Sequence, residues 1–191
     1  MSDSLLLGLE GVLEQAGWDL PARLYVIEGT EVEPTFTPLA EVAGHPCDVL
    51  HGMWSEGVRV PEGAFGLALI VEGERHLNLD EFKERSPKGY EQIRAVAIEE
   101  FGDADEELIQ TVVQTAWTDM CAETSPLSMP EQRRVHVRNS VAVLQTGWTI
   151  MVVRDQGGDP VVLDPVPPAR LQQSRVPDFM WQFLTGKEPV D

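Results

Sequence analysis

RRVHVRNSVAVLQTGWTIMVVRD, residues Arg133 to Asp155, has the composition of two long strands joined by a tight turn. Both halves are rich in Val, Ile, Thr and Trp, which suit a half-buried pleated surface, and the only glycine lies between them. We therefore predict a β-hairpin whose two loop residues are Thr146 and Gly147. This loop places three pairs of residues opposite each other: Val143 and Ile150, Val141 and Val152, and Arg138 and Asp155.

Apolar periodicity in the rest of the chain predicts several helices and two further strands. The helices are expected at residues 4–16, 48–56, 90–101, 103–121 and 176–185, and the strands at 22–28 and 63–72. Asp103 is the expected N-cap of the fourth helix. No period is found at 31–46, which we interpret as loop, or at 73–89, which we interpret as a connection or hinge. We predict one α+β domain over residues 1–191, with a mainly antiparallel four-stranded sheet, packed helices and an optional helical insertion at 88–123.

Charge is the most unusual property of the composition. The chain has 32 acidic and 14 basic residues, a net charge of −18. Such a field repels nucleic acid and anionic membranes, so we expect neither as a partner. Two interpretations stay open: the acids keep the protein soluble, or they form a face that docks a basic partner.

The cysteines and the amino terminus indicate a cytoplasmic protein. Cys47 and Cys121 are too few for a disulfide framework and form no CxxC pair. The first residues lack the basic start of a secretory signal, and no apolar run reaches the roughly 20 residues of a membrane span. We expect reduced thiols and no cofactor.

One helix face is a candidate for partner binding. The stretch after Asp105 has the clearest helical period of the chain, and its side opposite the apolar face is polar and almost uncharged. Gln110, Gln114 and Thr118 lie on that side. A face of this kind suits contact with another protein.

A second candidate is the basic cluster of the hairpin. It consists of Arg134, His136 and Arg138, with Arg154 across the hairpin. These side chains either bind an anionic ligand at an exposed end of the sheet, or pair with the protein's own carboxylates, Asp155 first.

Motifs for metal binding or nucleophilic catalysis are weak or missing. His45, Cys47 and His51 lie within seven residues, but their spacing is not that of a zinc site, and we predict no metal there. No GxSxG motif or glycine-rich phosphate loop occurs. An enzyme is therefore less expected than a binding protein.

Three segments resemble a known family. They are GWDLPARLY at residues 17–25, the stretch from Trp54 to Glu72 that ends in GLALIVE, and the hairpin from Arg133 to Arg154. Together they are similar to a family of uncharacterised actinobacterial proteins, from high-GC Gram-positive bacteria, with no assigned function. The resemblance covers roughly half of the chain and leaves out Tyr90 to Cys121. It implies the fold and a cytosolic location, and it leaves the function open.

Two functions of different classes follow. The first is a non-enzymatic, acidic adaptor or chaperone-like protein that binds a protein partner and forms a homodimer. The alternative is a small enzyme or ligand-binding domain that holds an anionic ligand with the basic cluster.

Overall fold

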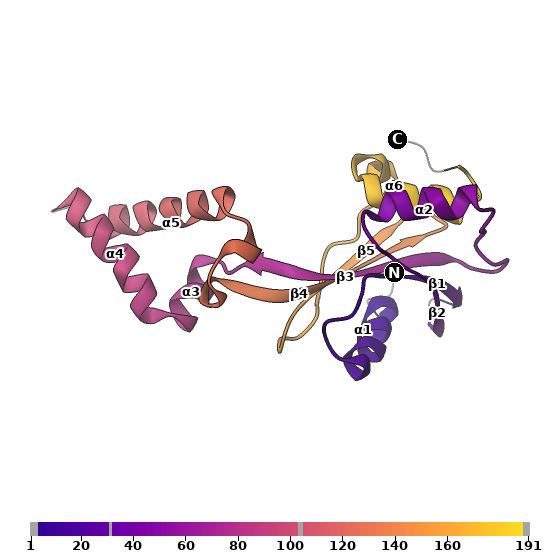
Figure 1. Ribbon diagram of the computed structural model, residues 1–191, viewed down its shortest axis with the longest axis horizontal. Coiled ribbons are helices and arrows are strands. Elements are labelled where there is room, and N and C mark those ends of the chain that lie inside the picture. The colour runs from indigo at the N-terminus through magenta and orange to yellow at the C-terminus, as the bar shows by residue number, and fades with distance from the viewer. Residues whose placement is uncertain (1–3, 31, 103–104, 189–191) are drawn as a thin grey trace. The chain divides into compact units, whose positions relative to one another are not determined.

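The computed structural model describes residues 4–30, 32–102 and 105–188 (Figure 1). The chain divides into two compact units, Met1–Gly73 with Val137–Asp191, and Glu74–His136. We call them the sheet unit and the helical unit. The boundary falls within β3 (Gly66–His76) and β4 (Arg134–Leu144), so both strands contribute residues to both units. The predicted helical insertion at 88–123 lies inside the helical unit.

The strands form one antiparallel sheet in an α+β fold, as predicted, but the sheet has six strands rather than four. Their order is β2-β1-β3-β4-β5-β6. The strands predicted at 22–28 and 63–72 correspond to β1 (Arg23–Gly29) and β3. The hairpin corresponds to β4 and β5 (Thr149–Asp155). The two additional strands are β2 (Pro34–Glu41) and the two-residue β6 (Val161–Val162).

β2 overturns the prediction of a loop at 31–46. This strand lies at one end of the sheet order and pairs with β1 along its whole length. Its Pro34 and Pro38 lack a backbone N–H, which strands tolerate at an edge. The pairing shifts by one residue between Leu24 and Tyr25, a bulge that breaks the alternation of side chains. Because of the two prolines and the bulge, the sequence of β2 does not show the alternation of apolar and polar residues that predicts a strand.

The predicted register of the hairpin is wrong by one residue. Val143 lies opposite Thr149, Ala142 opposite Ile150, and Val137 opposite Asp155. The loop has three residues rather than two, because Leu144 N–H donates to Trp148 O at 2.9 Å, and Gly147 occupies the left-handed region with φ of 85°. A one-residue slip moves every side chain of a strand to the other face. Ile150 and Val152 therefore pack with Ala142 and Leu144.

Helices cover both faces of the sheet in the sheet unit (Figure 1). α1 (Ser4–Ala16) has the predicted bounds, and its Leu5, Leu9 and Leu13 pack with Ile150 and Val152. α2 (Pro46–Ser55) and α6 (Arg175–Leu184) start two residues and one residue before their predicted positions. They cover the opposite face, where Leu50, Phe179 and Phe183 pack on Leu24, Leu67 and Val143. Each face of the sheet therefore has its own apolar core.

The helical unit contains α3 (Leu79–Arg85), α4 (Pro87–Phe101) and α5 (Glu106–Glu123), followed by two short 3₁₀ turns. The prediction of a connection at 73–89 is wrong, because β3 continues to His76 and α3 follows. α3 buries only Phe82, which gives no apolar period, but it has a complete capping box between Asn78 and Glu81. α5 is capped by Asp105, whose carboxylate accepts from Leu108 N–H at 2.9 Å. The predicted cap, Asp103, lies outside the described residues.

Candidate functional site

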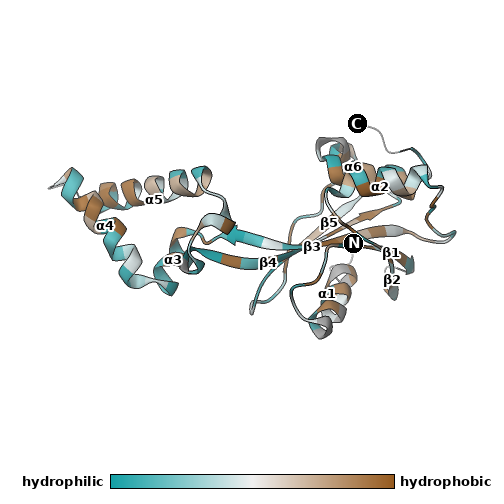
Figure 2. Ribbon diagram, viewed as in Figure 1, coloured by the Kyte–Doolittle hydropathy of each residue, from teal (hydrophilic) through white to brown (hydrophobic). Residues whose placement is uncertain are grey.

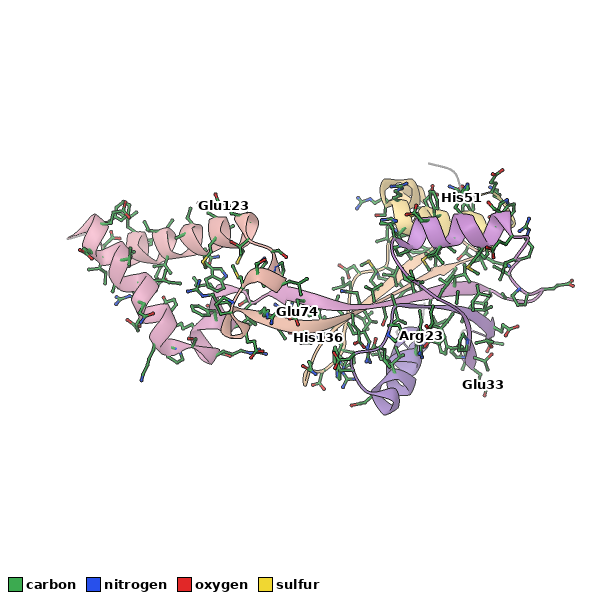
Figure 3. The ribbon with its side chains drawn as sticks, in the orientation of Figure 1. Arg23, Glu33, His51, Glu74, Glu123 and His136 are labelled. Atoms are coloured by element: carbon green, nitrogen blue, oxygen red, sulfur yellow. The ribbon has the colours of Figure 1, made fainter. Side chains whose placement is uncertain are left out.

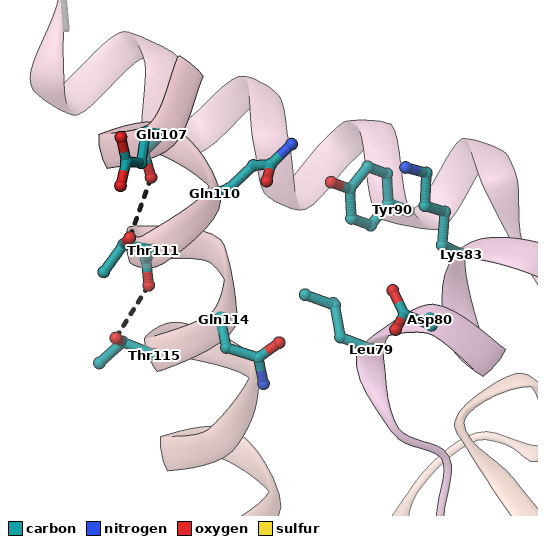
Figure 4. Close-up of a pocket in the computed structure, with 9 residues that line it drawn as sticks. All are labelled: Leu79, Asp80, Lys83, Tyr90, Glu107, Gln110, Thr111, Gln114 and Thr115. Carbon is teal, nitrogen blue, oxygen red and sulfur yellow. Dashed lines mark hydrogen bonds between the residues drawn. The ribbon is translucent and has the colours of Figure 1, made fainter. Parts of the chain in front are cut away.

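A pocket of about 400 Å³ lies in the helical unit, among α3, α4 and α5 (Figure 4). α3 contributes Leu79, Asp80 and Lys83, and α4 contributes Tyr90. The side chains from α5 are mostly uncharged amides and hydroxyls: Glu107, Gln110, Thr111, Gln114 and Thr115. Figure 4 shows Gln110 facing Tyr90, and Gln114 on the side of Leu79. The pocket is therefore polar, with one aromatic ring in its wall.

The α5 wall follows from the helical repeat. Ile109, Val113 and Trp117 are buried, so Gln110 and Gln114 project beside them, one turn apart. Thr111 and Thr115 donate their hydroxyl hydrogens to the carbonyl oxygens of Glu107 and Thr111, both at 2.9 Å (Figure 4). Each hydroxyl keeps its lone pairs as acceptors. The wall therefore offers both donors and acceptors to an occupant.

Buried contacts fix the opposite wall. Trp117 Nε1–H donates to Leu77 O at 3.0 Å, and the rings of Trp117 and Phe82 stack with centroids 4.4 Å apart. The stacking links α5 to α3, which carries Leu79, Asp80 and Lys83 of the pocket. The Lys83 ammonium lies 4.9 Å from the centroid of the Tyr90 ring, a cation–π contact.

An ion pair joins α4 to the first turn of α5. Arg94 Nη2 lies 2.6 Å from Glu106 Oε2. The hydrogen bond from Arg94 holds the pKa of Glu106 below its ordinary value. This ion pair joins the two helices at Glu106, the residue of α5 directly before the first pocket residue, Glu107.

Two of the three predicted partner-binding residues line this pocket. Gln110 and Gln114 do so, whereas Thr118 lies one turn further on and accepts a hydrogen bond from Gln114 Nε2 at 3.4 Å. The pocket residues of α3 and α4 were not predicted. Tyr90 lies at the start of the helix predicted at 90–101, and Lys83 lies in the segment 73–89 that was predicted to be a connection. No periodic signal in 73–89 could have identified it.

The basic cluster of the hairpin is largely paired with the protein's own carboxylates. Arg138 was expected at an exposed end of the sheet, but its side chain is fully buried. Its Nε and Nη2 donate to Glu72 Oε1 at 2.9 and 2.6 Å, and its Nη1 lies 3.7 Å from Glu10 Oε2. Arg138 Nη2 also donates to Gly17 O, and the guanidinium lies 4.6 Å from the centroid of the Trp18 ring. These partners replace water and make the burial of the charge tolerable.

His136 and Arg154 contact other carboxylates than those that Arg138 contacts. His136 Nδ1 lies 3.3 Å from Glu74 Oε1 (Figure 3), and Arg154 Nη2 lies 2.9 Å from Glu14 Oε1. The hydrogen bond from Arg154 lowers the pKa of Glu14. Arg134 is half-buried. These contacts agree with the alternative in which the basic residues pair internally, although Asp155 lies opposite Val137 and not Arg138.

The three segments that carry the family resemblance meet at Arg138. Gly17 and Trp18 come from the first segment, Glu72 ends the second, and Arg138 belongs to the hairpin. The other carboxylate oxygen of Glu72, Oε2, accepts from the backbone N–H groups of Asp19 and Leu20 at 2.7 and 3.1 Å. These contacts anchor the chain between α1 and β1 to the sheet. Membership of the family stays a prediction.

The described residues contain no group of three or more His, Cys, Asp or Glu side chains arranged to hold a metal ion. His45 and His51 are exposed, while Cys47 is buried. His45 Nδ1 accepts from Cys47 N–H at 3.3 Å and so caps α2. Burial raises the pKa of the Cys121 thiol, which lowers its thiolate fraction.

Comparison with known proteins gives no relative. No protein-family model, no curated protein and no solved structure matches the chain. Among the described helices, none combines the length and apolar character that crossing a membrane requires.

Proposed function

We propose that this protein is a non-enzymatic binding protein that holds a segment of a partner protein in the pocket of the helical unit. The lining of the pocket carries the proposal. Small-molecule sites of this volume are mostly lined by apolar side chains with few polar groups, whereas here seven of the nine lining residues, all but Leu79 and Tyr90, have charged, amide or hydroxyl side chains. Amide and hydroxyl groups instead match the donors and acceptors of a peptide backbone.

The spacing of the two glutamines supports an extended segment. Four residues of helix rise about 6 Å, which separates Gln110 from Gln114 along α5. Two residues of an extended chain rise about 6.6 Å, the repeat of backbone groups that point the same way. Each glutamine amide has both a donor and an acceptor, so the pair fits two successive backbone groups of the partner. Tyr90 then contacts a partner side chain between them.

Site-specific photo-crosslinking tests the proposal. The full chain would carry a benzophenone amino acid at Thr111, which lines the pocket, and in a matched control at Gln92, which is exposed on α4. We expect crosslinks from position 111 to map to one segment of one partner. The Q110A/Q114A double variant should weaken binding of that segment about fivefold or more, because two hydrogen bonds contribute about 1–3 kcal/mol together.

Equal crosslinking from positions 111 and 92 would contradict the proposal, as would unchanged affinity in Q110A/Q114A. The Q92A variant controls for the loss of a surface glutamine and should bind like the wild type. Circular dichroism of each variant verifies that α5 is intact.

The proposal includes a homodimer and an adaptor or chaperone-like role. Small acidic chaperones that escort a client are a functional analogy, and the net charge of −18 is what supports it. Native mass spectrometry of the untagged chain tests the subunit number directly. A mass of one chain at micromolar concentration would exclude the dimer and leave the pocket proposal standing.

A further inference from the structure

The hydroxyl of Tyr90 is a polar group of the pocket that the protein itself leaves without a partner. Tyr90 is 6 % exposed and lies on the buried side of α4, a helix that carries both hydrophobic and hydrophilic residues (Figure 2). Its ring lines the pocket, and its hydroxyl points toward Gln110 on α5 (Figure 4). No hydrogen bond joins this hydroxyl to any residue that the structure describes. The Tyr90 hydroxyl can therefore bind an occupant of the pocket.

An unpartnered hydroxyl in a pocket wall restricts what can fill the pocket. Water satisfies the hydroxyl while the pocket is open to solvent. An occupant displaces that water, and a hydroxyl that it covers without pairing weakens binding. An acceptor at the same place recovers the hydrogen bond. An occupant that binds well therefore presents an acceptor to Tyr90.

An extended segment presents such an acceptor through its backbone. In an extended chain, the backbone groups of successive residues point alternately to opposite sides. Gln110 and Gln114 both belong to α5, so the two residues that they hold direct their backbone groups toward α5. The residue between these two directs its carbonyl to the opposite wall, to which Tyr90 belongs (Figure 4).

We propose that the pocket holds three successive residues of an extended segment, and that the Tyr90 hydroxyl donates a hydrogen bond to the backbone carbonyl of the middle residue. This inference rests on the proposed function and names the conformation that the partner segment adopts. The Tyr90 ring contacts the side chain of the same residue. A helical segment is excluded, because its carbonyl oxygens accept from its own N–H groups. Since the three hydrogen bonds reach the backbone alone, the pocket selects unfolded or extended chains of varied sequence.

Displayed peptides test the inference on the full chain. A phage library of random peptides would be selected on the wild type and counter-selected on T111W, whose indole fills the pocket at Thr111. Peptides that bind the wild type but not T111W are pocket peptides. We expect Y90F, which keeps the ring and removes the hydroxyl, to bind them about fivefold more weakly. Y25F is the matched control and should bind like the wild type, because Tyr25 is also 6 % exposed but belongs to the sheet unit.

An ester scan of one pocket peptide locates the carbonyl that Tyr90 binds. Each synthetic version has an ester in place of one peptide bond, which weakens that carbonyl as an acceptor and removes the N–H. An ester at a contacted bond weakens binding to the wild type, and its effect shrinks in the variant that lacks the contacting side chain. We expect Y90F to reduce most strongly the effect of one ester, whereas Q110A and Q114A reduce the effects of esters on either side of it.

The outcomes separate this inference from the proposed function. Equal affinity of Y90F and the wild type for the pocket peptides would overturn the inference alone, as would a Y90F effect that couples to no ester. A lower unfolding temperature of Y90F would show that the hydroxyl is paired inside the protein, and would also overturn it. If no peptide distinguishes the wild type from T111W, or if Q110A/Q114A binds the pocket peptides normally, the proposed function fails and the inference fails with it. T115W replaces T111W if circular dichroism shows that T111W is unfolded.

Discussion

Arg138 and Glu72 form an ion pair whose side chains are 0 % and 5 % exposed, and one carboxylate oxygen accepts from both Nε and Nη2 of the guanidinium. Glu10 approaches the same guanidinium from α1, and Ser140 donates its hydroxyl hydrogen to Glu10 Oε1. The pair therefore connects β3, β4, α1 and the chain between α1 and β1. Its role is to hold the sheet unit together.

Removing Arg138 should destabilise the protein strongly. In R138A, Glu72 and Glu10 stay buried without their counter-charge, which costs about 3–5 kcal/mol of the free energy of unfolding. Urea unfolding followed by circular dichroism measures the loss. R23A is the control, because the Arg23–Glu41 pair is exposed and contributes about 0–1 kcal/mol. Equal losses in the two variants would refute the importance of the buried pair.

Trp117 should stabilise the helical unit through its indole hydrogen as well as its ring. W117F keeps an aromatic ring against Phe82 but leaves the carbonyl of Leu77 without the Nε1–H donor. We expect a loss of about 1–3 kcal/mol, measured by hydrogen exchange of the buried amides of α5. W181F removes a hydrogen bond to Gln145 O in more exposed surroundings and should cost less. A W117F protein as stable as the wild type would show that the hydrogen bond contributes nothing.

The Arg75–Glu81 contact makes the start of α3 sensitive to acid. Hydrogen bonding from Arg75, at 2.7 and 2.9 Å, lowers the pKa of Glu81 below its ordinary value of 4.5. A folded-state pKa that lies below the unfolded one gives stability above about pH 4.5 that is lost as the pH falls through the folded value. NMR titration of the Glu81 side chain should show this lowered pKa, and R75A should raise it. An unchanged midpoint in R75A would disprove the assignment.

Gly147 should tolerate alanine less well than Gly157, although both have positive φ, 85° and 82°. A Cβ at position 147 would meet Pro168 Cβ at 3.0 Å, while one at 157 meets nothing within 4 Å. G157A should cost about 1–2 kcal/mol for the left-handed backbone, and G147A should cost more because of the added clash. Chemical denaturation compares the two. Equal costs would show that Pro168 moves aside freely.

Local patterns predicted the parts of the fold whose residues alternate or repeat. α1 and the hairpin strands have such patterns, and Gln110 and Gln114 could be found because they lie opposite the apolar face of α5. Tertiary contacts decide the rest. Arg138 is buried together with its ion-pair partner Glu72, which lies 66 residues away in the chain. No local sequence pattern reveals a partner at that distance. Lys83 and Leu79 join the pocket only because α3 packs against Trp117.

The prolines of β2 should limit aggregation of this protein at high concentration. An edge strand normally offers a row of N–H and C=O groups to any other exposed strand, which is how sheets of different molecules fuse. Pro34 and Pro38 remove two donors from that row. A strand of another molecule that approaches β2 therefore finds an incomplete ladder, and fibre growth from this edge is disfavoured.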